Sequence, residues 1–215
     1  MPGTRAVAGL VAAACVMAGC SVPEAEQPVE SSPTSVAAQS ATPVPSTTAS
    51  RTGVNQDPAE FADPVVEHAG AAEVNPVLLM AILYNESYKP HDPELERAWQ
   101  KIDPDAAFGV ANMHRAAFDD TRRGRPFADR RWEELPDDPD LAIEAAAWYL
   151  HDLAARLPVA QRPPLRHDDL LAIGYNAGPG AMSAVANGAA PGTQAQSYVE
   201  KLRRNWAKAE DAVRR

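Results

Sequence analysis

The fold is decided by one stretch of the chain, residues 75–87, which reads NPVLLMAILYNES. Asn75 is a favourable helix N-cap, and Pro76 suits the first helical position because the N–H that it lacks has no partner inside a helix. The segment 77–83 holds no polar side chain, and a helix that is apolar on every side is buried in a protein core. The sequence therefore predicts a central buried helix that begins at Pro76.

Helical periodicity continues outward from this stretch, and no segment makes a convincing strand. The further helices that we expect run from Pro139 to just before Pro158, from Leu170 to Tyr175 and from about Gln196 onward. The stripe of the last helix, which includes Tyr198 and Trp206, is expected to lie in the core. The segment 90–105 holds three prolines without clear periodicity, so we expect a loop there. Together these patterns predict an all-α fold, with one compact helical domain over residues 57–215.

Composition and charge exclude several classes of protein. The chain has 215 residues and a formal net charge of -9, from 20 Lys+Arg and 29 Asp+Glu. This acidic balance argues against nucleic-acid binding, which needs a basic face. Both cysteines, Cys15 and Cys20, precede the helical domain, and the five histidines form no zinc-binding pair on a helix face. We therefore expect no metal, no cofactor and no nucleic-acid partner, and we expect a monomer.

The N-terminus has the pattern of an export signal. Arg5 precedes an apolar run from Ala6 to Ala18, which is shorter than the roughly 20 residues that span a bilayer. Residues 16–20 read VMAGC, which resembles the bacterial lipoprotein box, with Met17 in place of the usual Leu. This resemblance implies a signal peptide over residues 1–19, a lipid on Cys20 and an anchor on the outer side of a bacterial membrane. The alternative is an ordinary cleaved signal in which Cys20 is incidental.

Residues 20–56 separate this signal from the helical domain. The stretch from Ser21 to Asn55 is rich in Ser, Thr, Pro, Ala and Val, and it contains neither Leu, Ile nor any aromatic residue. Such a composition buries too little apolar surface to offset the entropy lost on ordering. We predict a disordered tether that links the lipidated Cys20 to the domain.

Glu86 is the acid with the most chemical interest. It follows Leu83, Ile82 and Leu79 at spacings of three, four and seven, so it lies on the apolar side of the central helix. Partial burial raises the pKa of a carboxyl group toward the range of a general acid at neutral pH. Periodicity alone leaves open the alternative that Glu86 is the first exposed residue at the helix end.

The motifs around Glu86 resemble one enzyme family, the soluble lytic transglycosylases, which have a goose-type lysozyme-like fold. Glu86-Ser87 after the apolar helix resembles the catalytic segment of that family, and Phe108 to Met113 is similar to its Gly-Leu-Met-Gln segment. Residues 172–180, AIGYNAGPG, resemble its Ala-Tyr-Asn-Ala-Gly motif, which is the most specific of the three. The helix at 145–157 and Tyr198-Val199 are also similar. The resemblance covers roughly residues 64–206, with the motifs in the family's order.

This resemblance implies a reaction and a set of site residues. Lytic transglycosylases of peptidoglycan cleave the β-1,4 bond between N-acetylmuramic acid and N-acetylglucosamine with one Glu as acid and base, and leave 1,6-anhydro ends. By that similarity Glu86 is the catalytic residue, and Ser87 and Tyr175 support it by hydrogen bonds. The residues that would line the groove for the peptidoglycan strand are Gly109, Asn112, Met113, Asn176, Ala177 and Gly178.

Two departures from the family pattern keep other functions open. Asn112 stands where the family usually has Gln, and the stretch from Glu86 to Gly109 is longer than usual. That stretch contains three aspartates, Asp92, Asp103 and Asp105, one of which could activate water in an inverting muramidase, a hydrolase with two carboxylates. A further alternative is a non-catalytic lipoprotein scaffold that binds glycan.

Overall fold

The computed structural model describes residues 56–88, 91–157 and 165–215. The predicted signal peptide, the predicted lipid site at Cys20 and most of the predicted tether lie outside these residues. Within them the chain is mostly helical, which confirms the all-α prediction. The helices are α1 (Ala62–Ala71), α2 (Pro76–Glu86), α3 (Pro93–Gln100), α4 (Arg115–Thr121), α5 (Pro139–Arg156), α6 (His167–Ala186) and α7 (Thr193–Val213), with short 3-10 turns η1 (Pro58–Phe61) and η2 (Trp132–Glu134). None of the helices in these described ranges is long and apolar enough to cross a membrane.

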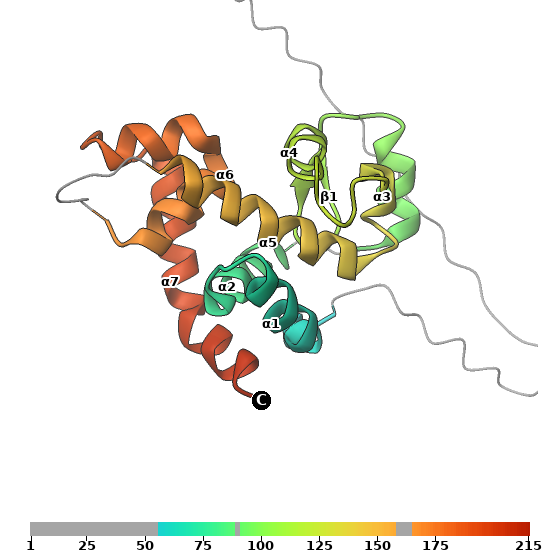
Figure 1. Cartoon of the computed structure of the whole chain (residues 1–215), viewed down its shortest axis with the longest axis horizontal. Coiled ribbons are helices and arrows are strands. Elements are labelled where there is room, and N and C mark those ends of the chain that lie inside the picture. Colours follow the sequence, from blue (N-terminus) through green and yellow to red (C-terminus); the bar gives the residue numbers. More distant parts are fainter. Residues whose placement is uncertain (1–55, 89–90, 158–164) are drawn as a thin grey trace, which may run out of the picture. The chain divides into compact units, whose positions relative to one another are not determined.

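Helix α2 forms the centre of the domain, as its sequence predicts. The side chain of Asn75 accepts a hydrogen bond from the backbone N–H of Val77 at 3.0 Å and so caps the helix. All residues from Leu78 to Glu86 are buried. The helix packs against α1, α6 and α7 (Figure 1). Because its neighbours surround it, the helix needs no polar face, and the uninterrupted apolar run is explained.

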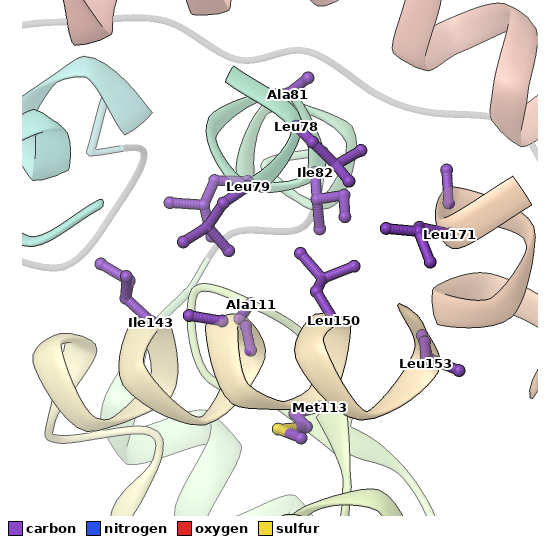
Figure 2. Close-up of a cluster of buried hydrophobic side chains, with 14 of the residues drawn as sticks. Leu78, Leu79, Ala81, Ile82, Ala111, Met113, Ile143, Leu150, Leu153 and Leu171 are labelled. Carbon is purple, nitrogen blue, oxygen red and sulfur yellow. The ribbon is translucent and has the colours of Figure 1, made fainter. Parts of the chain in front are cut away.

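The hydrophobic core brings α2 together with α5 and the segment before α4. In Figure 2 the side chains of Leu79 and Ile82 point from α2 toward Ile143 and Leu150 of α5. Ala111 lies in the same cluster and is fully buried. Burial of side chains of this size stabilises the fold by roughly 1.5–3 kcal/mol each. The core therefore fixes the end of α2, where Glu86 is, relative to the segment around Ala111.

Helix α6 is longer than the apolar segment that predicts it and is kinked. It runs from His167 to Ala186, and Gly178 in its middle has non-helical backbone angles, with φ at 84° and ψ at 165°. A positive φ favours glycine, and Pro179 follows directly. The motif at 176–180 thus bends the helix and turns its second half away from the first.

The segment expected as a loop, residues 90–105, contains helix α3, so that prediction was wrong for residues 93–100. Asp92 caps this helix by accepting from the backbone N–H groups of Glu94 and Leu95 at 2.9 and 3.2 Å, and Pro93 occupies its first position. Pro93 therefore starts the helix instead of breaking it, and Pro104 lies beyond its end. The apolar residues do recur at helical spacing, but they face outward: Leu95, Trp99 and Ile102 are exposed.

A short antiparallel hairpin connects α3 to α4. Strand β1 (Ala107–Phe108) pairs with β2 (Met113–His114), with Phe108 opposite Met113. The connecting turn has left-handed backbone at Gly109, with φ at 73°, and at Asn112, with φ at 49°. The backbone N–H of Asn112 donates to the carbonyl of Gly109 at 2.8 Å and closes the turn. We call residues 109–112 the 109–112 turn.

Candidate active site

Glu86, the last residue of α2, is a buried acid with two neutral hydrogen-bond donors. Its side chain is attached to a core helix, yet 5% of the residue reaches the surface. Asn112 Nδ2 donates to Oε2 at 2.8 Å, and the hydroxyl of Tyr198 donates to Oε1 at 2.8 Å. The donors come from the 109–112 turn and from α7, so three separate parts of the chain meet at one carboxylate. This contact excludes the alternative in which Glu86 is a plain exposed residue at a helix end.

Helix α7 is held in register with α2 by polar contacts beside Glu86. Asn85 is 1% exposed, and its Nδ2 donates to the carbonyl of Tyr198 at 3.1 Å. Asn205 Nδ2 donates in turn to Asn85 Oδ1 at 2.9 Å, and Lys201 Nζ donates to the carbonyl of Asn85. Buried polar groups that are all hydrogen-bonded specify one arrangement of the elements that carry them. The hydroxyl of Tyr198 is therefore fixed in its position at Glu86.

Tyr198 is a donor that keeps its own proton. Burial and, after it, the negative charge of Glu86 raise the pKa of the Tyr198 phenol well above its usual value. The same two causes, in the same order, raise the pKa of Tyr175. Asn112 and Tyr198 are thus uncharged donors that stabilise the Glu86 anion by hydrogen bonds, and Lys201 lines the same cavity.

Tyr175 and Ser87 lie near Glu86, but their hydroxyls donate to backbone carbonyls. Tyr175 donates to the carbonyl of Ala111 at 2.7 Å, and Ser87 donates to the carbonyl of Tyr84 at 3.0 Å. The expected hydrogen bonds from these two residues to the carboxylate are therefore replaced by those from Asn112 and Tyr198. Tyr175 acts on the site one step away, because it holds the 109–112 turn. Ser87 caps the last turn of α2.

Two cavities meet beside Glu86. One has a volume of about 530 Å³ and is lined by Glu86, Tyr198 and Lys201 among others. The other has a volume of about 460 Å³ and is lined by Tyr149 and Pro179 among others. The residues that line both are Asn112, His114, Tyr175 and Asn176. Glu86 therefore lies along a hollow that continues past it on one side, which suits a polymeric substrate.

The remaining residues expected to line a groove fall into two groups. Asn176 lines both cavities, and Met113, Ala177 and Gly178 line the one near Pro179. The side-chain Oδ1 of Asn176 is buried with no hydrogen-bond partner, so it can accept from a bound ligand. Gly109 faces the protein instead: a Cβ there would lie 2.8 Å from the carbonyl oxygen of Leu135. Gly109 is therefore needed because it allows the positive φ and leaves room for the carbonyl of Leu135.

Two of the three aspartates of the segment before the hairpin, Asp92 and Asp103, accept backbone N–H groups of their own segment, and Asp105 is exposed. Asp92 caps α3, Asp103 accepts from the backbone N–H of Asp105, and none of the three is among the described residues that line the Glu86 cavity. Within that described lining Glu86 is the one carboxylic acid, while the adjoining cavity is also lined by Asp120 and Asp152, which pair with Arg123 and Arg125. Across residues 56–88, 91–157 and 165–215, no cluster of His, Cys, Asp or Glu could hold a metal ion.

Sequence reasoning did not assign Tyr198 to the site. Its apolar ring falls on the helical stripe of α7 and packs against the core, which is how it was interpreted. The one available signal was the similarity of Tyr198-Val199 to a family motif. A stripe position says which way a ring points, but its hydroxyl reaches Glu86 only through the packing of α7 on α2, 112 residues away in the chain.

A buried acid with neutral donors beside a long hollow defines a candidate acid catalyst for glycosidic bonds. A family model described as the transglycosylase SLT domain matches residues 63–196. The chain belongs to this family, and membership implies lytic transglycosylase activity on peptidoglycan, whose glycan strands SLT domains bind. Comparisons with curated proteins and with solved structures gave no significant match.

Proposed function

We propose that this protein is a peptidoglycan lytic transglycosylase in which Glu86 alone is acid and base. It cleaves the β-1,4 bond between N-acetylmuramic acid and N-acetylglucosamine and leaves 1,6-anhydro-N-acetylmuramic acid ends. The observation that carries the proposal is the setting of Glu86: two neutral donors hold its carboxylate, and the described lining of its cavity has no second acid.

In the first step the protonated Glu86 carboxyl donates its proton to the glycosidic oxygen. The bond from that oxygen to C1 of N-acetylmuramic acid breaks, and the N-acetylglucosamine part leaves with a new hydroxyl. Glu86 becomes an anion while C1 becomes positively charged. The hydroxyl of Tyr198 and the amide of Asn112 already lie at hydrogen-bond distance from this anion, so they stabilise it without reorganisation.

In the second step the Glu86 carboxylate accepts the proton of the C6 hydroxyl of the same sugar. The C6 oxygen then bonds to C1 and closes the anhydro ring, so no water is consumed and Glu86 is again protonated. A carboxylate of moderate basicity suits this second step, because Glu86 must both donate and accept a proton in one catalytic cycle. Asn112 and Tyr198 suit this exchange, because neither gives up its own proton to the carboxylate.

The hollow beside Glu86 supports a polymeric glycan as the substrate. Asn176 offers a buried acceptor at the junction of the cavities, and N-acetyl and hydroxyl groups of the sugars are donors that fit it. Tyr175 and Asn112 line both cavities as well. The strand would therefore pass Glu86 with sugars on either side of the bond that is cleaved.

The inverting muramidase fits the site less well. Such an enzyme needs a second carboxylate about 6.5–9.5 Å from the acid, with room for a water molecule between them. The side chains of Asp92 and Asp103 instead accept backbone N–H groups of their own segment. A non-catalytic glycan-binding scaffold remains the second alternative, which the buried and hydrogen-bonded Glu86 argues against, because a scaffold has no use for an acid there.

The proposal is tested by digesting purified peptidoglycan with the parent protein and with Glu86→Gln. We expect anhydro-muropeptides from the parent and none from the variant. Reducing ends from the parent would establish the muramidase instead. Glycan that is bound by both proteins and cleaved by neither would establish the scaffold.

We also propose that the chain is exported and anchored by a lipid on Cys20, with residues 20–56 as the tether. The support is the sequence around residue 20 alone. The test is the incorporation of labelled palmitate in a bacterial host, with Cys20→Ala as the variant and Cys15→Ala as the matched control. Label is expected in the control and not in Cys20→Ala; equal label in both would refute the anchor.

A further inference from the structure

The 109–112 turn, which carries Asn112, is held by a carboxylate that the proposed reaction does not use. Glu96 Oε2 accepts from the backbone N–H of Gly109 at 2.9 Å, and Glu96 Oε1 accepts from His91 Nδ1 at 2.9 Å. The side chain of Glu96 is 13% exposed. A hydrogen bond from a backbone N–H to an ionised carboxylate is among the stronger ones in proteins, so α3 is fastened to the first residue of this turn.

The 109–112 turn needs such support because of its backbone. Asn112 has φ at 49°, a left-handed conformation that is uncommon outside glycine, although asparagine adopts it more readily than most other residues. The hydroxyl of Tyr175 fixes the carbonyl of Ala111, and the N–H of Asn112 donates back to Gly109. Together with the hydrogen bond from Gly109 to Glu96, these contacts hold both ends and the middle of the turn. They thereby keep the Asn112 side chain at hydrogen-bond distance from Glu86.

The orientation of α3 supports a specific role for Glu96. A surface helix ordinarily buries its apolar residues and exposes its acids. Helix α3 departs from this pattern: Leu95 and Trp99 are 68% and 52% exposed, while Glu96 between them is turned inward. Burial of apolar surface therefore does not explain how α3 is placed; polar contacts hold it, namely those of Glu96 with Gly109, of Arg97 with Asp137 and of Gln100 with the carbonyl of Trp132.

We propose that Glu96 is a positioning residue that holds the 109–112 turn and so keeps Asn112 on the Glu86 carboxylate. The expected loss of kcat rests on the proposed function, whereas the expected shift of the 109–112 turn and of Asn112 does not depend on it. Loss of the Glu96 carboxylate frees the Gly109 N–H, the turn relaxes toward ordinary backbone angles, and Asn112 Nδ2 moves off Oε2. A displacement of about 1 Å at a catalytic group can cost up to a hundredfold in rate.

The kinetic test compares four variants with the parent protein. Glu96→Ala removes the acceptor, Glu96→Asp shortens it by one methylene, and Glu96→Gln keeps an acceptor oxygen for Gly109. Glu94→Ala, at an exposed position of the same helix, is the matched control. We expect kcat to fall about tenfold for Glu96→Ala and less for Glu96→Asp, with KM changed by less than about threefold. Glu96→Gln should keep at least about a third of the parent kcat, and the control all of it.

A second readout does not depend on activity. In amide proton–nitrogen spectra the Gly109 N–H signal should move upfield in Glu96→Ala and in Glu96→Asp, together with the Asn112 side-chain signals, and stay in place in Glu96→Gln. If Glu96→Ala does not fold, the Asp and Gln variants decide. A parent-like kcat and spectrum in Glu96→Ala or Glu96→Asp, or a Gln variant as impaired as these, would overturn the proposal. Absence of product from the parent would sink the proposed function and leave the spectra to decide this one.

Discussion

Two buried acids of this domain, Glu86 and Asp169, are held in opposite ways. Glu86 at the end of α2 receives hydrogen bonds from the neutral side chains of Asn112 and Tyr198. Asp169 in the first turn of α6 is fully buried and receives paired hydrogen bonds from Arg166 and Arg203, the shortest at 2.7 Å. Burial alone would raise the pKa of Asp169, yet the arginines hold it below its usual value.

The difference matches the proposed division between an acid for chemistry, Glu86, and an acid for structure, Asp169. The two arginines favour the ionised form of Asp169 and tie α6 to α7, so Asp169 serves the structure and is not a proton donor at neutral pH. Hydrogen bonds from neutral side chains stabilise an anion less strongly than those from arginine, and this fits the proposed role of Glu86 as a proton donor. The type of partner, more than the burial of the carboxylate, therefore distinguishes Asp169 from the proposed catalytic Glu86, and the following predictions test that distinction.

The largest expected effect is that of Glu86→Gln on activity. The variant keeps the shape of the side chain but can neither donate nor accept the proton, so kcat should fall by roughly a thousandfold or more, about 4 kcal/mol in activation free energy. The free energy of unfolding should change by about 1 kcal/mol or less. The matched control is Glu144→Gln on α5, a glutamate whose pKa is raised by burial but which lines neither cavity. A comparable loss of activity in the control would contradict the assignment.

The next effect is the reverse pattern in Asp169→Asn. Removing one partner of a buried ion pair costs about 3–5 kcal/mol, and we expect about 3 kcal/mol in the free energy of unfolding because both arginines are half exposed. The value of kcat at a temperature where the variant is folded should stay within about twofold of the parent. Denaturant unfolding measures the first quantity. Asp211→Asn, which breaks an exposed pair with Arg214, is the control and should change stability by less than about 1 kcal/mol.

A smaller effect is expected from Tyr198→Phe. The variant loses one hydrogen bond to a charged group, which is worth about 1.5–2 kcal/mol here, or about tenfold to thirtyfold in kcat/KM. Because the hydroxyl stabilises the anion, its removal favours the protonated acid, and the alkaline limb of the pH–rate profile should move to higher pH. Tyr84→Phe, on the same helix as Glu86 but with its hydroxyl near Asp57, should leave the profile in place. An unchanged limb in Tyr198→Phe would mean that Tyr198 only packs.

The smallest effect is a difference in acid sensitivity. The folded-state pKa of Asp169 lies below its unfolded value, so its stabilisation is complete above the unfolded value of about 4 and is lost as the pH falls through the folded value. The parent should therefore lose more unfolding free energy than Asp169→Asn when the pH is lowered below about 4. Equal losses would show that the arginines do not hold Asp169 ionised. Urea unfolding at a series of pH values provides the measurement.

The sequence predicts the parts of this site that local rules control. A helix cap, an apolar run and a spacing of three and four place Glu86 on a buried helix end, and the family resemblance places Asn112 and Asn176 at the cavities. The partners of a side chain are a different matter. Tyr198 reaches Glu86, and Tyr175 reaches Ala111, only through packing between distant helices, which periodicity does not encode.

Helix α3 was missed for a related reason. A proline in the sequence can either begin a helix or interrupt one, and here only the capping contacts of Asp92 show that Pro93 begins one. Its apolar residues recur at helical spacing but lie exposed, contrary to the usual link between that pattern and the core. The inward-facing Glu96 followed from neither propensity nor pattern.

The central claim, that Glu86 acts without a second acid and without water, is tested most directly by digestion of peptidoglycan in oxygen-18 water. Mass spectrometry of the muropeptides then shows whether the oxygen newly bonded to C1 comes from water or from the C6 hydroxyl of the sugar. The account predicts 1,6-anhydro-N-acetylmuramic acid ends that carry no oxygen-18. Reducing N-acetylmuramic acid ends that carry oxygen-18 would contradict it and identify the protein as a hydrolase.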